Sequence, residues 1–247
     1  MLPLWKLFFI ATDGTNGVEL WSLDVCETVD AAVSGCVPAT AALDKCETKL
    51  SDATRTLLLA TNKCGIKNSD AAVKGNAFDG QACKDAAKTK FTTKVTGLTA
   101  KDPACPPSCV GAGSAAAWAG VAQSAVDAMF AGIYCDLSSA TAQDDGFRGA
   151  VPVAASKKCE NGVAKAVFKL AASLLKCNRK AADMAVKGKS FDRSECQAKA
   201  ALKYETFRGN VMACPPCLDD MHVAVLALTV ADAINGDFTS GTFCATP

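Results

Sequence analysis

The chain has 247 residues, half of them apolar, so it can bury a hydrophobic core and does not have the composition of a disordered protein. Lys and Arg number 26 against 25 Asp and Glu, and this net charge of +1 argues against nucleic acid as the main partner. Fourteen cysteines beside a single histidine favour disulfides over metal sites, so we predict no metal, no cofactor and an extracellular or cell-surface location.

Residues 7–24 differ in kind from the rest of the chain, and we assign residues 1–24 to a partial β-repeat-like leader. Two short apolar runs flank Asp13-Gly14, which predicts a β-hairpin, and an unstructured leader is the alternative. Glu19-Leu20-Trp21 together with Asp13-Gly14-Thr15 resembles the Glu-Leu-Trp and Asp-Gly-Thr repeats of secreted bacterial proteins, which look like β-propeller blades. The resemblance covers 18 residues and departs from the pattern at Val25-Cys26. It implies a partial repeat and a secreted bacterial origin, and no propeller function.

The remainder of the chain contains a duplication. Residues 70–83 recur as residues 183–196 at a constant offset of 113. We therefore predict a connector at 25–45, which holds Cys26 and Cys36, a first helical repeat at 46–135 and a second at 157–247. The polar, glycine-containing stretch 136–156 is the predicted linker between the repeats.

Each repeat opens with two helices whose apolar positions recur in steps of three and four. We expect the first helix to run from about Thr40 to Lys63, with Gly65 as its C-cap. The second helix of repeat 2 is expected to begin at Asp192, an N-cap residue. Gly75 and Gly188 fall in the intervening loops, where glycine can supply a positive φ.

The cysteine spacing predicts how these helices are joined. Within a helix the cysteines lie 18 residues apart, which places them on one face but too far apart to bond each other. Residues paired across an antiparallel hairpin have a constant index sum; the two pairs in repeat 2 meet this condition, and those in repeat 1 differ by four, which a small loop difference could explain. The predicted bridges are Cys159–Cys214, Cys177–Cys196, Cys46–Cys105 and Cys64–Cys83.

A third, apolar segment closes each repeat, at residues 112–134 and 218–235. Helices that are apolar nearly all round are usually buried, so we expect both to pack against the hairpins, with His222 as a core residue. A Cys217–Cys244 bridge is feasible, whereas the pairing of Cys26, Cys36, Cys109 and Cys135 stays open. The predicted fold is all-α: two tandem disulfide-stapled three-helix repeats after a short β-like segment.

Two candidate chemistries remain. Cys214-Pro-Pro-Cys217 has the spacing of a dithiol redox site, but the first cysteine ends one helix and the second opens the next, so structural disulfides are the favoured interpretation. Residues 157–208 carry 13 basic and five acidic side chains, which could bind an anionic ligand or simply form a solvated surface. The candidate anion-binding residues are Lys176, Arg179, Lys180, Lys187, Lys189 and Arg193.

The sequence contains no Ser/His/Asp set and no phosphate-binding glycine loop, so no catalytic residue is assigned. We expect a non-enzymatic structural or binding module of a secreted or surface bacterial protein. The alternatives are binding of an anionic glycan or cell envelope through repeat 2, and a thiol-disulfide oxidoreductase at the Cys-Pro-Pro-Cys corner. Partners would be a cell-surface polymer or a second copy of the chain. The absence of a long uncharged apolar run predicts no membrane span.

Overall fold

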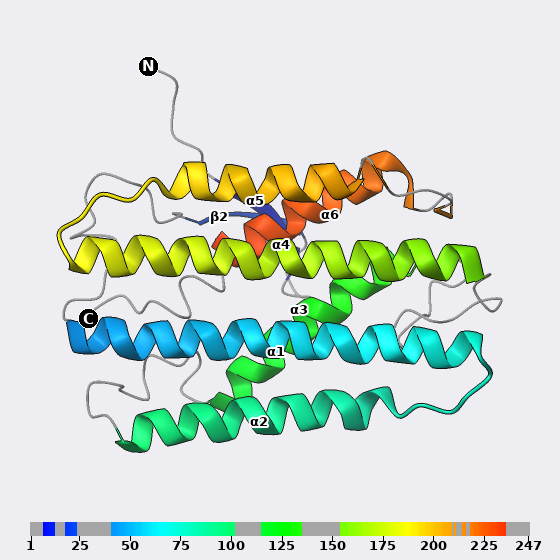
Figure 1. Cartoon of the computed structure of the whole chain (residues 1–247), viewed down its shortest axis with the longest axis horizontal. Coiled ribbons are helices and arrows are strands. Elements are labelled where there is room, and N and C mark those ends of the chain that lie inside the picture. The colour runs from blue at the N-terminus through cyan, green and yellow to red at the C-terminus, as the bar shows by residue number, and fades with distance from the viewer. Residues whose placement is uncertain are drawn as a thin grey trace.

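A computed structural model places two strands and six helices within the residues that it describes (Figure 1). The described residues are 7–12, 18–23, 41–101, 115–134, 154–208, 210, 214–215 and 218–235. The elements are β1 (Leu7–Thr12), β2 (Val18–Leu23), α1 (Ala41–Val73), α2 (Gly80–Lys101), α3 (Ala115–Ile133), α4 (Ala154–Val186), α5 (Arg193–Arg208) and α6 (Asp220–Ala233). The predicted all-α class is confirmed for the part of the chain after the hairpin.

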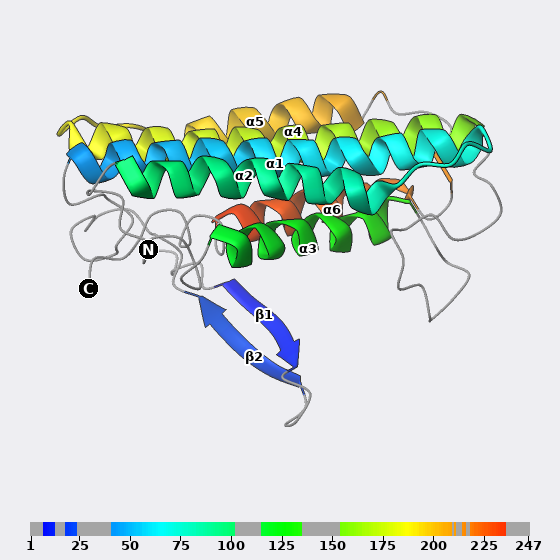
Figure 2. The same ribbon diagram turned by 90° about the horizontal axis from the view of Figure 1, so that it is seen from below.

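The helices form two layers. Helices α2, α1, α4 and α5 lie side by side in that order, and α1 and α4 at the centre run antiparallel (Figure 1). Helices α3 and α6 lie together against one face of this layer (Figure 2). Strands β1 and β2 pair antiparallel from Leu7↔Leu23 to Thr12↔Val18, as the hairpin pattern predicts, on the side of α3 and α6. The opposite face of the four-helix layer carries no other described element.

Disulfides join the two helices of each hairpin. Cys64 is bonded to Cys83 with a Cα–Cα distance of 5.8 Å, and Cys177 is bonded to Cys196 at the same distance. The predicted Cys159–Cys214 bridge is also present, with a Cα–Cα distance of 5.2 Å. These three pairings are confirmed. The remaining predictions involve residues outside the described ranges: Cys46 is disulfide-bonded, but its predicted partner Cys105 and the pair Cys217–Cys244 lie there.

The hairpin loops repeat the same local structure. In repeat 2, Gly188 has φ 64°, and the backbone N–H of Lys189 donates to the carbonyl oxygen of Met184 at 2.8 Å. Gly75 has φ 67° and ends α1 in the same way. Such Schellman endings need a left-handed residue, which glycine adopts without strain. Helix α5 then begins at the predicted cap, because Asp192 accepts a hydrogen bond from the Glu195 N–H at 2.7 Å.

The predicted end of the first helix near Lys63 is wrong. Helix α1 continues through Gly65 to Val73. Gly65 is buried, and a Cβ atom at this position would lie 2.3 Å from two ring carbons of Phe130 in α3. The lack of a side chain at Gly65 therefore allows α1 and α3 to pack closely, and this glycine does not end α1.

Helices α3 and α6 pack against the hairpins as predicted, but α6 is buried on one side only, and the prediction that His222 is a core residue is wrong. Only one side of α6 faces the core, through Val223 and Val230, while Met221 and Leu228 are 69% and 65% exposed. The outer layer contains two helices, so no described element covers the other side of α6. His222 is exposed as well, and its Nδ1 lies 2.8 Å from the Oδ1 atom of Asp219, the residue that caps α6.

Candidate functional site

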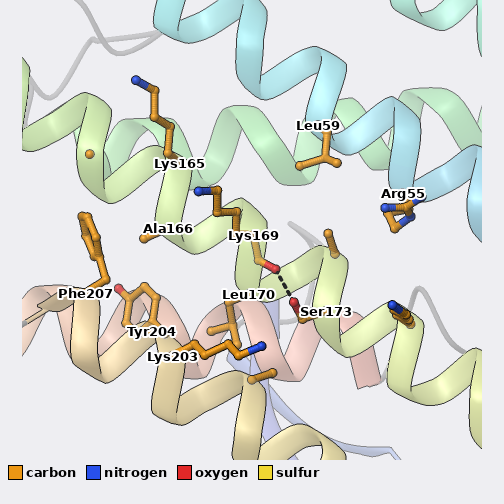
Figure 3. Close-up of a pocket in the computed structure, with 14 residues that line it drawn as sticks. Arg55, Leu59, Lys165, Ala166, Lys169, Leu170, Ser173, Lys203, Tyr204 and Phe207 are labelled. Carbon is orange, nitrogen blue, oxygen red and sulfur yellow. Dashed lines mark hydrogen bonds between the residues drawn. The ribbon is translucent and has the colours of Figure 1, made fainter.

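Basic side chains of repeat 2 gather over a hollow on the uncovered face of the four-helix layer. Lys165, Lys169 and Lys176 project from one side of α4, because residues four and seven apart lie on the same face of a helix. Helix α5 forms one wall and α1 the other (Figure 3). The lining residues are Arg55, Leu59, Gly162, Lys165, Ala166, Lys169, Leu170, Ala172, Ser173, Lys176, Ala200, Lys203, Tyr204 and Phe207, which together define the basic hollow.

The hollow has a volume of about 670 Å³, and its lining contains five cationic residues and no carboxylate. Within the part of the chain that the structure describes, no ion pair involves the four lysines. The fifth cation, Arg55, lies 3.7 Å from the Asp52 carboxylate, which contacts Arg179 more closely at 2.7 Å. The cations of the hollow are therefore largely uncompensated by neighbouring acids.

The floor of the hollow is apolar and held in place. Tyr204 is only 3% exposed, and its hydroxyl donates to the carbonyl oxygen of Val223 at 2.6 Å. Burial raises the pKa of Tyr204, so the phenol stays neutral and its ring serves as part of the floor. Phe207 extends from the end of α5 toward α4 (Figure 3) and closes the floor beside Gly162. A Cβ at Gly162 would lie 3.3 Å from the Phe207 Cζ atom, so the glycine allows the ring to approach α4 closely.

A second hollow of about 500 Å³ continues along the groove between α4 and α5 and shares Lys176 and Lys203 with the first. Its charges are more nearly balanced, because its lining includes two acidic residues. One of them, Glu195, pairs with Lys199 at 2.6 Å, and the other, Asp192, caps α5. Attraction for an anion is therefore concentrated in the basic hollow.

Of the six residues predicted to bind anions, the structure places two in the lining of a hollow and four elsewhere. Lys176 lines both hollows and Lys180 lines the second. Arg179 instead joins the two repeats through Asp52, and Lys187 pairs with Asp183 at 2.5 Å. The other two, Lys189 and Arg193, line neither hollow.

The sequence-based assignment missed most cations of the basic hollow. Lys165 and Lys169 carry a signal that could have identified them, since they continue the spacing of Lys176 and Lys180 along one helix face. Lys203 could have been found by placing the second helix of the predicted hairpin beside the first. Arg55 could not, because it comes from repeat 1 and reaches the hollow only through the packing of α1 against α4.

Several of the residues that repeat 2 contributes to the basic hollow are not conserved at the equivalent positions of repeat 1. At the offset of 113 residues, Lys165 corresponds to Asp52, so an acidic residue replaces one of the cations. Gly162 corresponds to Lys49 and Phe207 to Lys94, so repeat 1 lacks both members of the aromatic contact that closes the floor. The duplication thus preserved the cysteine frame while this surface diverged.

The predicted dithiol redox site at Cys214 and Cys217 has less geometric support than the basic hollow. Cys214 is bonded to Cys159, so in this structure it does not form the Cys214–Cys217 disulfide of an oxidised redox motif, and Cys217 lies outside the described residues. Within the described ranges no three His, Cys, Asp or Glu side chains are grouped as metal ligands would be. None of the helices seen there has the length and apolarity needed to cross a membrane.

The three bridges are consistent with a protein that folds outside the reducing cytosol, where disulfides persist. Comparison of the chain with protein families, curated proteins and solved structures gives no match.

Proposed function

We propose that the chain is a non-enzymatic extracellular module of a secreted or surface bacterial protein, and that it binds an anionic cell-surface ligand in the basic hollow. The observation that supports this function most directly is the lining itself, where five cations surround an apolar floor without a carboxylate. A solvated lysine surface would be expected to alternate with acidic partners, as Lys199 does with Glu195 outside this hollow.

The electrostatics favour an anionic group that contacts several cations of the hollow at once. A single exposed ion pair contributes about 0–1 kcal/mol, so one lysine cannot hold a ligand. Several cations around one concave surface act together and also raise the rate of association, and both effects weaken as salt screens the charges. An acidic glycan or another anionic envelope component is the ligand that charge alone favours.

The disulfide frame supports the same function by holding the α5 wall of the site against α4. Cys177–Cys196 joins α4 to α5, and Cys159–Cys214 joins α4 to the chain that follows α5. A preorganised surface loses little conformational entropy when a ligand binds. The bridges would also preserve this geometry in an oxidising extracellular medium.

Retention on a heparin column tests this function. The triple variant Lys169→Gln, Lys176→Gln and Lys203→Gln removes three charges from the hollow, and we expect it to elute at clearly lower salt than the unaltered protein. A matched control removes three exposed lysines from repeat 1 by the substitutions Lys63→Gln, Lys67→Gln and Lys90→Gln. Equal losses of retention in the two triple variants would show that heparin senses overall charge, and the proposed site would be rejected.

A further inference from the structure

We infer that the ligand of the basic hollow is an amphiphilic anion, with an apolar body on the floor and its charged head group among the lysines. This inference rests on the proposed function, because it assumes that the hollow binds an anion. It adds the chemical class of the ligand, which the charge of the site does not determine.

The lining has few neutral polar side chains that could form hydrogen bonds with sugar hydroxyls. Apart from the cations, Ser173 and the Tyr204 phenol supply the only polar side chains, and the Ser173 hydroxyl donates to the backbone oxygen of Lys169 at 2.8 Å. The phenol is occupied too, since it donates to the backbone of α6. Sites that select small polar molecules present several placed polar groups, whereas this hollow offers apolar surface and ammonium groups.

Apolar side chains lie beside those charges on both sides of the hollow. Leu59 and Phe207 are only half-buried, and Figure 3 shows them on opposite sides of the hollow, with Ala166 and Leu170 of α4 between the walls. A volume of about 670 Å³ falls within the range of roughly 300–1,000 Å³ that is usual for small-ligand sites. An apolar chain placed here would remove both half-buried side chains from water.

The methylene groups of the lysine side chains add to this apolar surface. The four methylene groups of a lysine can lie along an apolar ligand while the ammonium group stays at the solvent edge. Lys203 lies beside Leu170 and Tyr204, while Lys165 and Lys169 project from α4 (Figure 3), and all three lysines are exposed. A ligand with a carboxylate, sulfate or phosphate head would therefore meet cations wherever its chain leaves the hollow.

Titration calorimetry with a series of alkanoates tests this class of ligand. Octanoate, decanoate and dodecanoate are used below their micellar concentrations, and acetate serves as the anion without a chain. Each methylene that becomes fully buried should strengthen binding by about four-fold, and partial burial by about two-fold, while acetate should show no binding. Affinity that is independent of chain length would overturn the inference.

Two substitutions at Phe207 separate the floor from the charges. Phe207→Gln makes the floor polar and should flatten the dependence on chain length, whereas Phe207→Leu should retain it. Circular dichroism and thermal unfolding establish that both variants fold. Equal effects of the two substitutions on chain-length dependence would contradict the role of the floor.

The two proposals fail in different ways. Heparin retention that depends on the hollow lysines, without any binding of dodecanoate, would leave the proposed function standing and overturn the amphiphilic ligand. Binding only to vesicles that contain anionic phospholipid, and not to monomeric dodecanoate, would overturn it as well. Dodecanoate binding that survives the triple lysine substitution unchanged would overturn the amphiphilic ligand, whereas the proposed function is rejected only by the heparin comparison.

Discussion

Gly65 of α1 lies directly against the ring of Phe130 in α3, so closely that a Cβ atom on the glycine would be 2.3 Å from the Cε2 and Cζ atoms. The ring cannot easily move away. It lies 5.6 Å from the ring of Tyr134 and 5.8 Å from that of Phe168, measured between centroids, and it is 2% exposed. The contact therefore fixes how closely the second layer approaches the first.

Gly65→Ala should destabilise the protein although alanine is the better helix former. The gain in helix propensity is about 1 kcal/mol, while overpacking a buried contact typically costs about 1–3 kcal/mol, and the short distance to Phe130 places the substitution at the costly end. Gly97→Ala in α2 is the matched control, because, apart from its chain neighbours and the backbone of its own helix, no atom of the described residues lies within 4 Å of the Cβ position, and the substitution should be neutral or stabilising. Urea unfolding of the two variants measures the difference. Equal stabilisation by the two substitutions would show that the Phe130 ring shifts to accommodate the added methyl group.

The contact between Gly65 and Phe130 also shows what could not be predicted from the sequence. A glycine after a helical stripe indicates a C-cap as readily as a packing contact, and the choice depends on α3, which lies far along the chain. Gly75 and Gly188 were interpreted correctly because a loop signal follows them locally. The disulfides could be predicted for another reason: the constant or nearly constant index sum of a hairpin relates cysteines on its two helices, so the packing of α3 and α6 need not be known.

Removal of the Cys177–Cys196 bridge should lower the free energy of unfolding by about 3 kcal/mol, the loss expected for a closed loop of this length. The equivalent bridge Cys64–Cys83 has the same sequence separation of 19 residues and supplies the matched comparison. Double Cys→Ala variants at each site, unfolded in urea under oxidising conditions, should lose similar stability. A loss confined to one repeat would mean that strain or solvation, rather than loop entropy, determines the contribution of the bridge.

The Asp52–Arg179 ion pair is expected to stabilise the contact between the two repeats. The Arg179 Nη1 atom lies 2.7 and 2.8 Å from the two carboxylate oxygens, and both side chains are partly buried. A double-mutant cycle with Asp52→Asn and Arg179→Met should give a coupling energy of about 1 kcal/mol that decreases as salt is added. The cycle of Asp52 with Arg55, whose closest approach is 3.7 Å, should give a smaller value. Equal coupling in both cycles would contradict a specific inter-repeat pair.

The same ion pair explains why the anion-binding residues were only partly predicted. Counting charges identifies a basic repeat, but it does not show which cations are neutralised by the other repeat. Arg179 is removed from the predicted set by Asp52, and Arg55 is added to the hollow, through one packing contact between α1 and α4. Periodicity along α4 could have identified Lys165 and Lys169 beside the predicted Lys176, whereas the composition of the site across helices required the tertiary structure.

Glu160 should make stability depend on pH. It corresponds to Glu47 at the repeat offset, and both carboxyl groups are buried beside their bridged cysteines. Burial raises the pKa of Glu160 from its ordinary value of 4.5 to about 7, and its Oε2 atom has no hydrogen-bond partner among the described residues. Between these two values the native state holds a proton that the unfolded state has lost. The free energy of unfolding should therefore fall as pH rises from 4.5 to 7, and level off above 7.

Glu160→Gln removes this dependence while keeping the shape of the side chain. Below pH 4.5 both proteins carry a neutral group, so their stabilities should differ little; above pH 7 the variant should be more stable by up to about 3 kcal/mol. Burial also raises the pKa of Asp44 and Asp232, but these carboxyl groups are common to both proteins and cancel in the difference. Urea unfolding from pH 4 to 8 measures the two curves. A constant separation between them would mean that the carboxyl group acts through packing, and that its ionisation in the native state matches that of the unfolded chain.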